Sequence, residues 1–103
     1  MAEDDLMTGL PGEELVRKGL ADFQAGRRTI GSCLAGIARP RLTRAGLLDP
    51  NLPCPAVEPE LQLYRLLRSE GGDAYSRYNA LVRELVSFEM ALDRRLREAK
   101  FDQ

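Results

Sequence analysis

The ten residues TIGSCLAGIA, from Thr29 to Ala38, contain no charged side chain, although 30% of the 103-residue chain is charged. An apolar stripe at helical spacing runs along the segment, and the residues opposite it are small. Two of those small residues are glycines, and each costs about 1 kcal/mol of helix propensity relative to alanine. Because packing must compensate for that cost, we expect a helix at the centre of the core. The stripe consists of Ile30, Cys33, Leu34 and Ile37.

Helical patterns recur on both sides of this segment. The spacing of apolar residues predicts a first helix over 11–25, ended by Gly26, and a third over 58–70. A short helical turn is expected at 41–45. The last helix begins near residue 74 and contains no proline or glycine up to the C-terminus. The sequence therefore predicts an all-α fold, a small helical bundle of about four helices with a long C-terminal helix.

The ends of the predicted domain follow from composition. Residues 1–10 are acidic and contain no basic side chain, so we expect a flexible acidic tail followed by a single helical domain over 11–103. The stretch LLDPNLPCPAVEP, residues 47–59, contains four prolines and is expected to be an irregular connection. Its apolar residues should fix it to the surface of the domain.

The charge balance excludes some classes of protein. The chain has fifteen basic and sixteen acidic residues, which gives a net charge of −1. Proteins that bind nucleic acid usually carry an excess of basic residues, so this balance argues against nucleic-acid binding. No run approaches the ~20 apolar residues needed to span a bilayer. The start, MAEDDLM, is the opposite of a cationic signal peptide. We therefore predict a cytoplasmic protein with no membrane association, in which Cys33 and Cys54 are reduced thiols.

Five arginines flank the uncharged segment within residues 27–44, and they form a candidate anion or nucleic-acid contact. The helix between them has no polar side chain long enough to read base edges. Residues 27–46 also contain no aromatic residue on which a base could stack. We interpret the cluster as a solvated corner, and nucleic-acid binding remains the first alternative function. The five are Arg27, Arg28, Arg39, Arg41 and Arg44.

The absence of histidine removes Ser–His and Cys–His nucleophile pairs. Two cysteines are too few for a tetrahedral zinc site. Among the carboxylates, Glu89 and Asp93 share a helix face, and Asp93 is expected to form an exposed ion pair with Arg97 four residues later. We therefore predict no catalytic residue, no metal and no cofactor.

Two groups on the last helix are candidate interface or pocket residues. Tyr75, Tyr78 and Asn79 fall in its first two turns and could line a pocket against residues 29–38, so small-molecule or cofactor binding is the second alternative. The helix should span roughly 40 Å, more than the ~35 Å expected of the domain. Leu92 and Leu96 would then project and require a partner, most commonly a second copy of the chain.

These observations favour a non-enzymatic function. We expect a regulatory or adaptor module that acts through protein–protein interaction, associates with itself as a homodimer, and can bind a further protein partner. The expectation depends on surplus apolar faces on the last two helices and on the missing catalytic residues.

Overall fold

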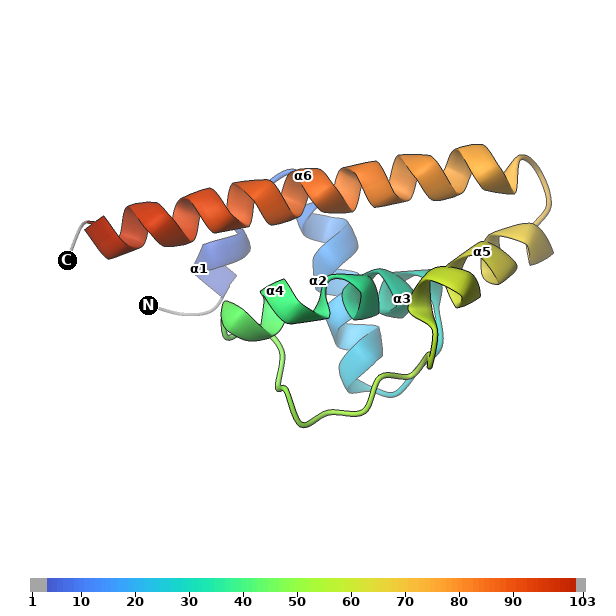
Figure 1. Cartoon of the computed structure of the whole chain (residues 1–103), viewed down its shortest axis with the longest axis horizontal. Coiled ribbons are helices and arrows are strands. Elements are labelled where there is room, and N and C mark those ends of the chain that lie inside the picture. The colour runs from blue at the N-terminus through green and yellow to red at the C-terminus, as the bar shows by residue number, and fades with distance from the viewer. Residues whose placement is uncertain (1–3, 102–103) are drawn as a thin grey trace.

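The computed structural model describes residues 4–101 and places them in six helices, which confirms the all-α prediction (Figure 1). The domain measures 48 × 27 × 17 Å, and the last helix runs along its longest axis. The other helices lie on one side of it. The helices are α1 (Asp4–Met7), α2 (Glu13–Gln24), α3 (Ile30–Ile37), α4 (Arg39–Arg44), α5 (Pro59–Ser69) and α6 (Ala74–Phe101).

Helix α3 occupies the interior, as its lack of charge predicts. It packs against α2, α4 and α5, and its middle residues Cys33, Leu34 and Ala35 are buried. Thr29 caps its first turn: the hydroxyl accepts a hydrogen bond from the Ser32 amide at 3.1 Å, and the Ser32 hydroxyl accepts one from the Thr29 amide at 2.9 Å. This reciprocal cap satisfies donors that the start of a buried helix would otherwise leave unpaired.

Helices α2 and α3 cross with their backbones in contact. A Cβ atom built on Gly19 would lie 2.4 Å from the carbonyl oxygen of Gly31, and one on Gly31 would lie 3.0 Å from the Gly19 Cα. Side chains at either position would therefore push the two helices apart. The glycine in α3 costs helix propensity but permits the close approach that buries the helix.

The connection after α3 differs slightly from its prediction. Helix α3 ends at Ile37, and α4 begins at Arg39 and contains Pro40, so a helix starts earlier than the expected turn at 41–45. Proline fits in the first turn of a helix because its missing N–H needs no partner there. Farther along, Leu47, Leu48 and Ala56 are buried, so apolar residues fix the proline-rich connection as expected.

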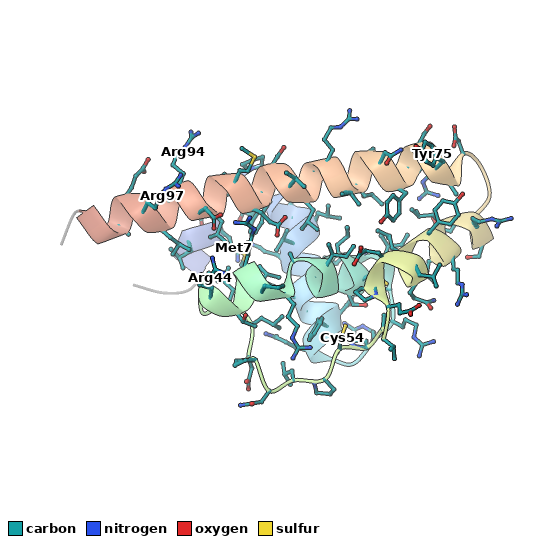
Figure 2. All side chains as sticks on the ribbon, viewed as in Figure 1. Met7, Arg44, Cys54, Tyr75, Arg94 and Arg97 are labelled. Carbon is teal, nitrogen blue, oxygen red and sulfur yellow. The ribbon has the colours of Figure 1, made fainter. Side chains whose placement is uncertain are left out.

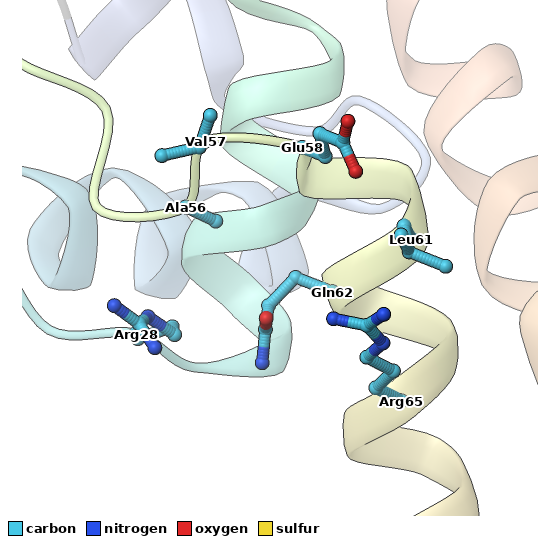
Figure 3. Close-up of a pocket in the computed structure, with 7 residues that line it drawn as sticks. All are labelled: Arg28, Ala56, Val57, Glu58, Leu61, Gln62 and Arg65. Carbon is cyan, nitrogen blue, oxygen red and sulfur yellow. The ribbon is translucent and has the colours of Figure 1, made fainter.

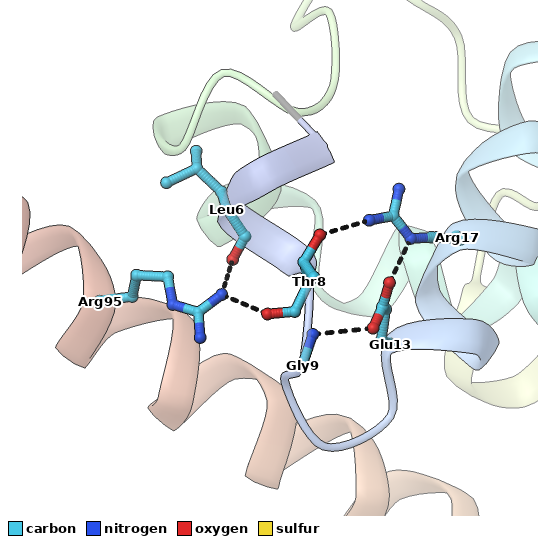
Figure 4. A network of polar contacts seen from close by, with 6 residues as sticks. All are labelled: Leu6, Thr8, Gly9, Glu13, Arg17 and Arg95. Carbon is cyan, nitrogen blue, oxygen red and sulfur yellow. Dashed lines mark hydrogen bonds and ion pairs between the residues drawn. The ribbon is translucent and has the colours of Figure 1, made fainter. Parts of the chain in front are cut away.

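The acidic N-terminal segment is only partly described, and the described part is folded. We expected residues 1–10 to form a tail outside the domain, but residues 4–7 form α1, and Met7 and Leu10 are buried. Arg95 of α6 donates hydrogen bonds to the carbonyl oxygens of Leu6 at 3.1 Å and Thr8 at 2.6 Å (Figure 4). Residues 1–3 lie outside the described part. The domain therefore begins before residue 11.

A second group of polar contacts joins this segment to α2. Glu13 accepts hydrogen bonds from the Gly9 amide at 2.9 Å and from the Arg17 Nε at 2.7 Å (Figure 4). Both contacts stabilise the carboxylate, and the pKa of Glu13 is lowered, chiefly by the Gly9 amide. The turn between α1 and α2 is thus held by the Glu13 side chain of α2.

The two leucines expected to project from α6 lie elsewhere. Leu92 is fully buried, and Leu96 is half-buried and packs against the core. The prediction fails because this part of α6 contacts other segments: Arg95 donates to the Leu6 and Thr8 carbonyl oxygens, and Arg41 of α4 contacts Asp93. Any partner surface on α6 must therefore use other residues.

Candidate functional site

The five arginines of residues 27–44 do not form one surface for an anion. Arg27 lies on Asp22, with the Arg27 Nη2 2.9 Å from Oδ1. Arg39 donates to the carbonyl oxygens of Pro50 and Leu52 in the proline-rich connection, and its guanidinium lies 5.6 Å from the centre of the Phe23 ring. These two arginines therefore make contacts within the fold.

Asp22 is the buried acceptor at the α2–α3 corner, with 6% of its surface exposed. Its Oδ2 accepts a hydrogen bond from the Thr29 hydroxyl at 2.7 Å, and its Oδ1 accepts one from the Arg27 Nε at 3.0 Å. The Thr29 hydrogen bond and then the Arg27 contact lower the pKa of Asp22, so the carboxylate stays ionised. Thr29 thus both caps α3 and joins it to α2.

Arg41 connects α4 to α6. Its Nε lies 3.3 Å from Glu89 Oε2, and its Nη1 contacts Asp93 Oδ2. We predicted that Asp93 would pair with Arg97, its neighbour along the helix; the structure pairs it with a residue 52 positions away. Burial raises the pKa of Glu89 despite the nearby Arg41. The ion pair across two helices is a structural contact between α4 and α6.

The remaining two arginines of the cluster, Arg28 and Arg44, are exposed. Arg28 donates to the Pro55 carbonyl oxygen at 3.4 Å. It also lines a hollow of about 280 Å³, where Figure 3 shows Arg28 and Arg65 near one rim and Glu58 away from them. Within residues 4–101, no buried side-chain nitrogen or oxygen lacks a hydrogen-bond partner, so no unpaired polar group directs a ligand into this hollow. The full lining is Arg28, Ala56, Val57, Glu58, Leu61, Gln62 and Arg65.

Cys33 and Cys54 are free thiols that form no disulfide with each other. Cys33 is fully buried, and desolvation raises its pKa to about 11, which keeps the thiol protonated. Cys54 is half-buried, and its Sγ lies 3.0 Å from the position that a Cβ on Gly36 would occupy. Gly36 therefore provides the space for Cys54. In the described part of the chain, no three Cys, Asp or Glu side chains gather as a metal site would require.

The predicted tyrosine group divides between two surroundings. Tyr78 packs edge-to-face against Tyr64 of α5, with ring centres 6.0 Å apart, and Asn79 is half-buried. Tyr75 is 68% exposed and faces a hollow between α5 and the start of α6. That hollow does not reach α3, where the cofactor alternative requires it.

Two exposed apolar residues that the sequence analysis did not name, Val86 and Met90, lie on the outer side of α6. Val86 is 44% exposed and Met90 is 64% exposed, and with Tyr75 they are large hydrophobic residues outside the core. Figure 2 shows Tyr75 near the start of α6 and Arg94 pointing away from the other helices. Helical spacing could have identified these positions, since Leu85, Phe88 and Leu92 already define a different, buried face.

Comparison with known proteins does not identify a family or a function for the chain. No protein-family model matches the chain, and neither a curated protein nor a solved structure matches it significantly. No helix within residues 4–101 is both long and apolar enough to cross a membrane. The functional inference therefore depends on the surface of the molecule itself.

Proposed function

We propose that the protein is a non-enzymatic interaction module that acts as a homodimer, with the outer side of α6 as its contact surface. The main support is the exposure of Tyr75, Val86 and Met90 on a helix whose opposite face completes the core. Exposed apolar side chains that cluster on one element are typical of association surfaces. In a regulatory or adaptor role, the surfaces of the dimer outside this contact would bind other proteins.

Three further observations favour this function over catalysis. The chain has no histidine, and the thiol of Cys33 is buried and protonated. The neighbouring carboxylates Glu89 and Asp93 are both paired with Arg41. A general acid or base must instead reach the proton that it transfers, and a nucleophile needs an activating base beside it.

Nucleic-acid binding has less support than self-association. Four of the five arginines, Arg27, Arg28, Arg39 and Arg41, contact carboxylates or carbonyl oxygens of the chain. Arg27 and Arg41 are exposed, but each is already paired with a carboxylate. This pairing reduces the basic charge that the cluster offers to phosphates, and phosphate contacts supply most of non-specific affinity.

Sedimentation velocity combined with light scattering tests the proposal. We expect the mass to rise from that of one chain to that of two between low and high micromolar concentration. A strict monomer at high micromolar concentration would contradict it. A parallel gel-retardation assay at low salt covers the alternative, because retarded nucleic acid with a monomeric protein would favour the arginine surface instead.

A further inference from the structure

Two exposed apolar side chains lie beside one hollow, where the proline-rich connection meets α5. Val57 is 97% exposed and Leu61 is 42% exposed, and both line the hollow of about 280 Å³ described above (Figure 3). The buried Ala56 lines the same hollow. The fold of the single chain therefore leaves a small apolar area in contact with water at this place.

The same hollow is bordered by basic side chains. Arg28, from the segment before α3, and Arg65 of α5 both line it, and Figure 3 shows the Gln62 side chain between them. Arg68 follows Arg65 by three positions, so it lies on the same side of α5, and it is exposed as well. The acidic residue of the lining, Glu58, lies away from Arg28 and Arg65.

The charges of Arg65 and Arg68 are not balanced by α5 itself. Residues three and four positions apart are neighbours on a helix, and none of these neighbours of either arginine is acidic. The two arginines are instead neighbours of each other, and like charges in this arrangement destabilise a helix slightly. Arg77, by contrast, lies 2.8 Å from Glu70. Within residues 4–101, neither Arg65 nor Arg68 forms such an ion pair.

We name these apolar and basic residues, with the glutamine between them, the α5 surface. It consists of Arg28, Val57, Leu61, Gln62, Arg65 and Arg68.

We propose that the α5 surface binds an acidic peptide segment of a partner protein. An apolar side chain of the segment would pack on the valine and the leucine, and its carboxylates would lie on the arginines, because a guanidinium binds a carboxylate through two parallel hydrogen bonds. The inference rests on the proposed interaction function and supplies a surface for the partner. It does not depend on the dimer, because the residues that line the hollow come from α5 and from the segments before α3 and α5.

The composition of the α5 surface favours a peptide over other anions. Within residues 4–101 every buried side-chain nitrogen and oxygen has a partner, so the charge at the hollow comes from exposed side chains. Exposed charges suit a segment that covers them from outside better than a small enclosed molecule. Glu58 and Glu60, at the start of α5, would repel a continuous phosphate backbone. A peptide can place carboxylates at the arginines alone and an apolar side chain on Val57 and Leu61.

The contact is small, which limits its strength. Ion pairs at an exposed surface contribute little each, so we expect a dissociation constant of roughly 10 μM to 1 mM. Added salt should weaken the binding, because it screens exposed charges.

Selection from a displayed library of random short peptides, with the intact chain as target, tests the proposal. We expect the enriched peptides to carry Asp or Glu close to a large apolar residue. The most enriched peptide, labelled with fluorescein, then serves as the probe in polarisation titrations. Arg65→Glu should weaken its binding at least about fivefold, because an attraction becomes a repulsion. Arg44→Glu is the matched control: Arg44 is exposed but does not line the hollow, so the same change of charge should leave binding unchanged.

Val57→Ser tests the apolar half of the α5 surface. Because Val57 is almost fully exposed, the substitution should leave thermal unfolding, followed by circular dichroism, unchanged. Binding of the labelled peptide should weaken roughly threefold or more, since less apolar area is removed from water.

Three outcomes would overturn the proposal. They are a selection that enriches no acidic peptide, binding that Arg65→Glu leaves unchanged although its fold is intact, and a labelled single-stranded oligonucleotide that binds more tightly than the peptide and also loses affinity in Arg65→Glu. Sedimentation of the unmodified chain separates this failure from that of the homodimer. A dimer that binds no acidic peptide removes only this inference, and a monomer that binds one removes only the homodimer.

Discussion

The α2–α3 crossing and the outer side of α6 differ in how closely their residues are packed. At the crossing, Gly19 and Gly31 leave no room for a methyl group, and Asp22 has hydrogen-bond partners on both oxygens. On the outer side of α6, Val86 is 44% exposed and Met90 is 64% exposed. The crossing therefore stabilises the single chain, whereas the exposed side chains of α6 add little to the fold of one copy. Substitutions in the two regions should have separable effects.

The largest expected effect is that of Gly19→Ala. Its Cβ would lie 2.4 Å from the Gly31 carbonyl oxygen, so the backbones must separate. We expect the free energy of unfolding to fall by about 3 kcal/mol, at the upper end of overpacking effects. Helix propensity alone predicts the opposite sign, a gain of about 1 kcal/mol, so urea denaturation followed by circular dichroism distinguishes the two.

The control for this substitution is Gln24→Ala, at an exposed position in the same helix, which should change the free energy of unfolding by less than about 0.5 kcal/mol. A Gly19→Ala variant as stable as the unmodified chain would show that the helices can separate at no cost. The close contact would then be incidental to the crossing.

A smaller effect is expected for Asp22→Asn. The substitution removes the charge that Arg27 contacts and weakens the bond to the Thr29 hydroxyl, so unfolding at neutral pH should become easier by about 1–2 kcal/mol. The pKa of Asp22 is lowered from 3.8 in the folded chain. The stabilisation is therefore present above the unfolded pKa and is lost as the pH falls through the folded value.

The measurement is urea unfolding of both chains from neutral pH to below pH 4, with Glu14→Gln as an exposed control in the same helix. The difference between the unmodified chain and Asp22→Asn should shrink towards acid. A difference independent of pH would mean that the charge of Asp22 does not contribute.

The smallest effect on the single chain, and the clearest on association, is expected for Val86→Asp. The substitution would bring a carboxylate of each copy into the proposed contact surface, so dimerisation should weaken at least about tenfold, equivalent to 1.4 kcal/mol. The free energy of unfolding of the monomer should change by less than about 0.5 kcal/mol, because Val86 is partly exposed. Sedimentation checks the first expectation and denaturation at low concentration the second, with Ser87→Asp as control.

The elements predicted best from the sequence are those that depend on neighbours along the chain. The uncharged run around Cys33 and Leu34 identifies the interior helix, and the Thr29 cap depends on a residue three positions away. The length of α6 follows from the absence of proline and glycine after residue 73. Local composition and periodicity are sufficient for such features.

Contacts between distant segments were not predictable in the same way. The segment before residue 11 has too few apolar residues to show a pattern, yet Met7 and Leu10 are buried and α1 packs against α6. Arg41 contacts Asp93 across 52 positions, although Arg97 offered a local partner. These outcomes depend on which helices meet in space, and sequence spacing alone carries no information about that.

The position of the α2–α3 crossing in the chain has a consequence for how the molecule assembles. Its two helices are joined by residues 25–29 only, whereas α6 comes from the opposite end of the sequence. Closing a short loop costs less conformational entropy than closing a long one. The close contact between Gly19 and Gly31 can therefore form at a lower entropic cost than a contact between α6 and the first helices.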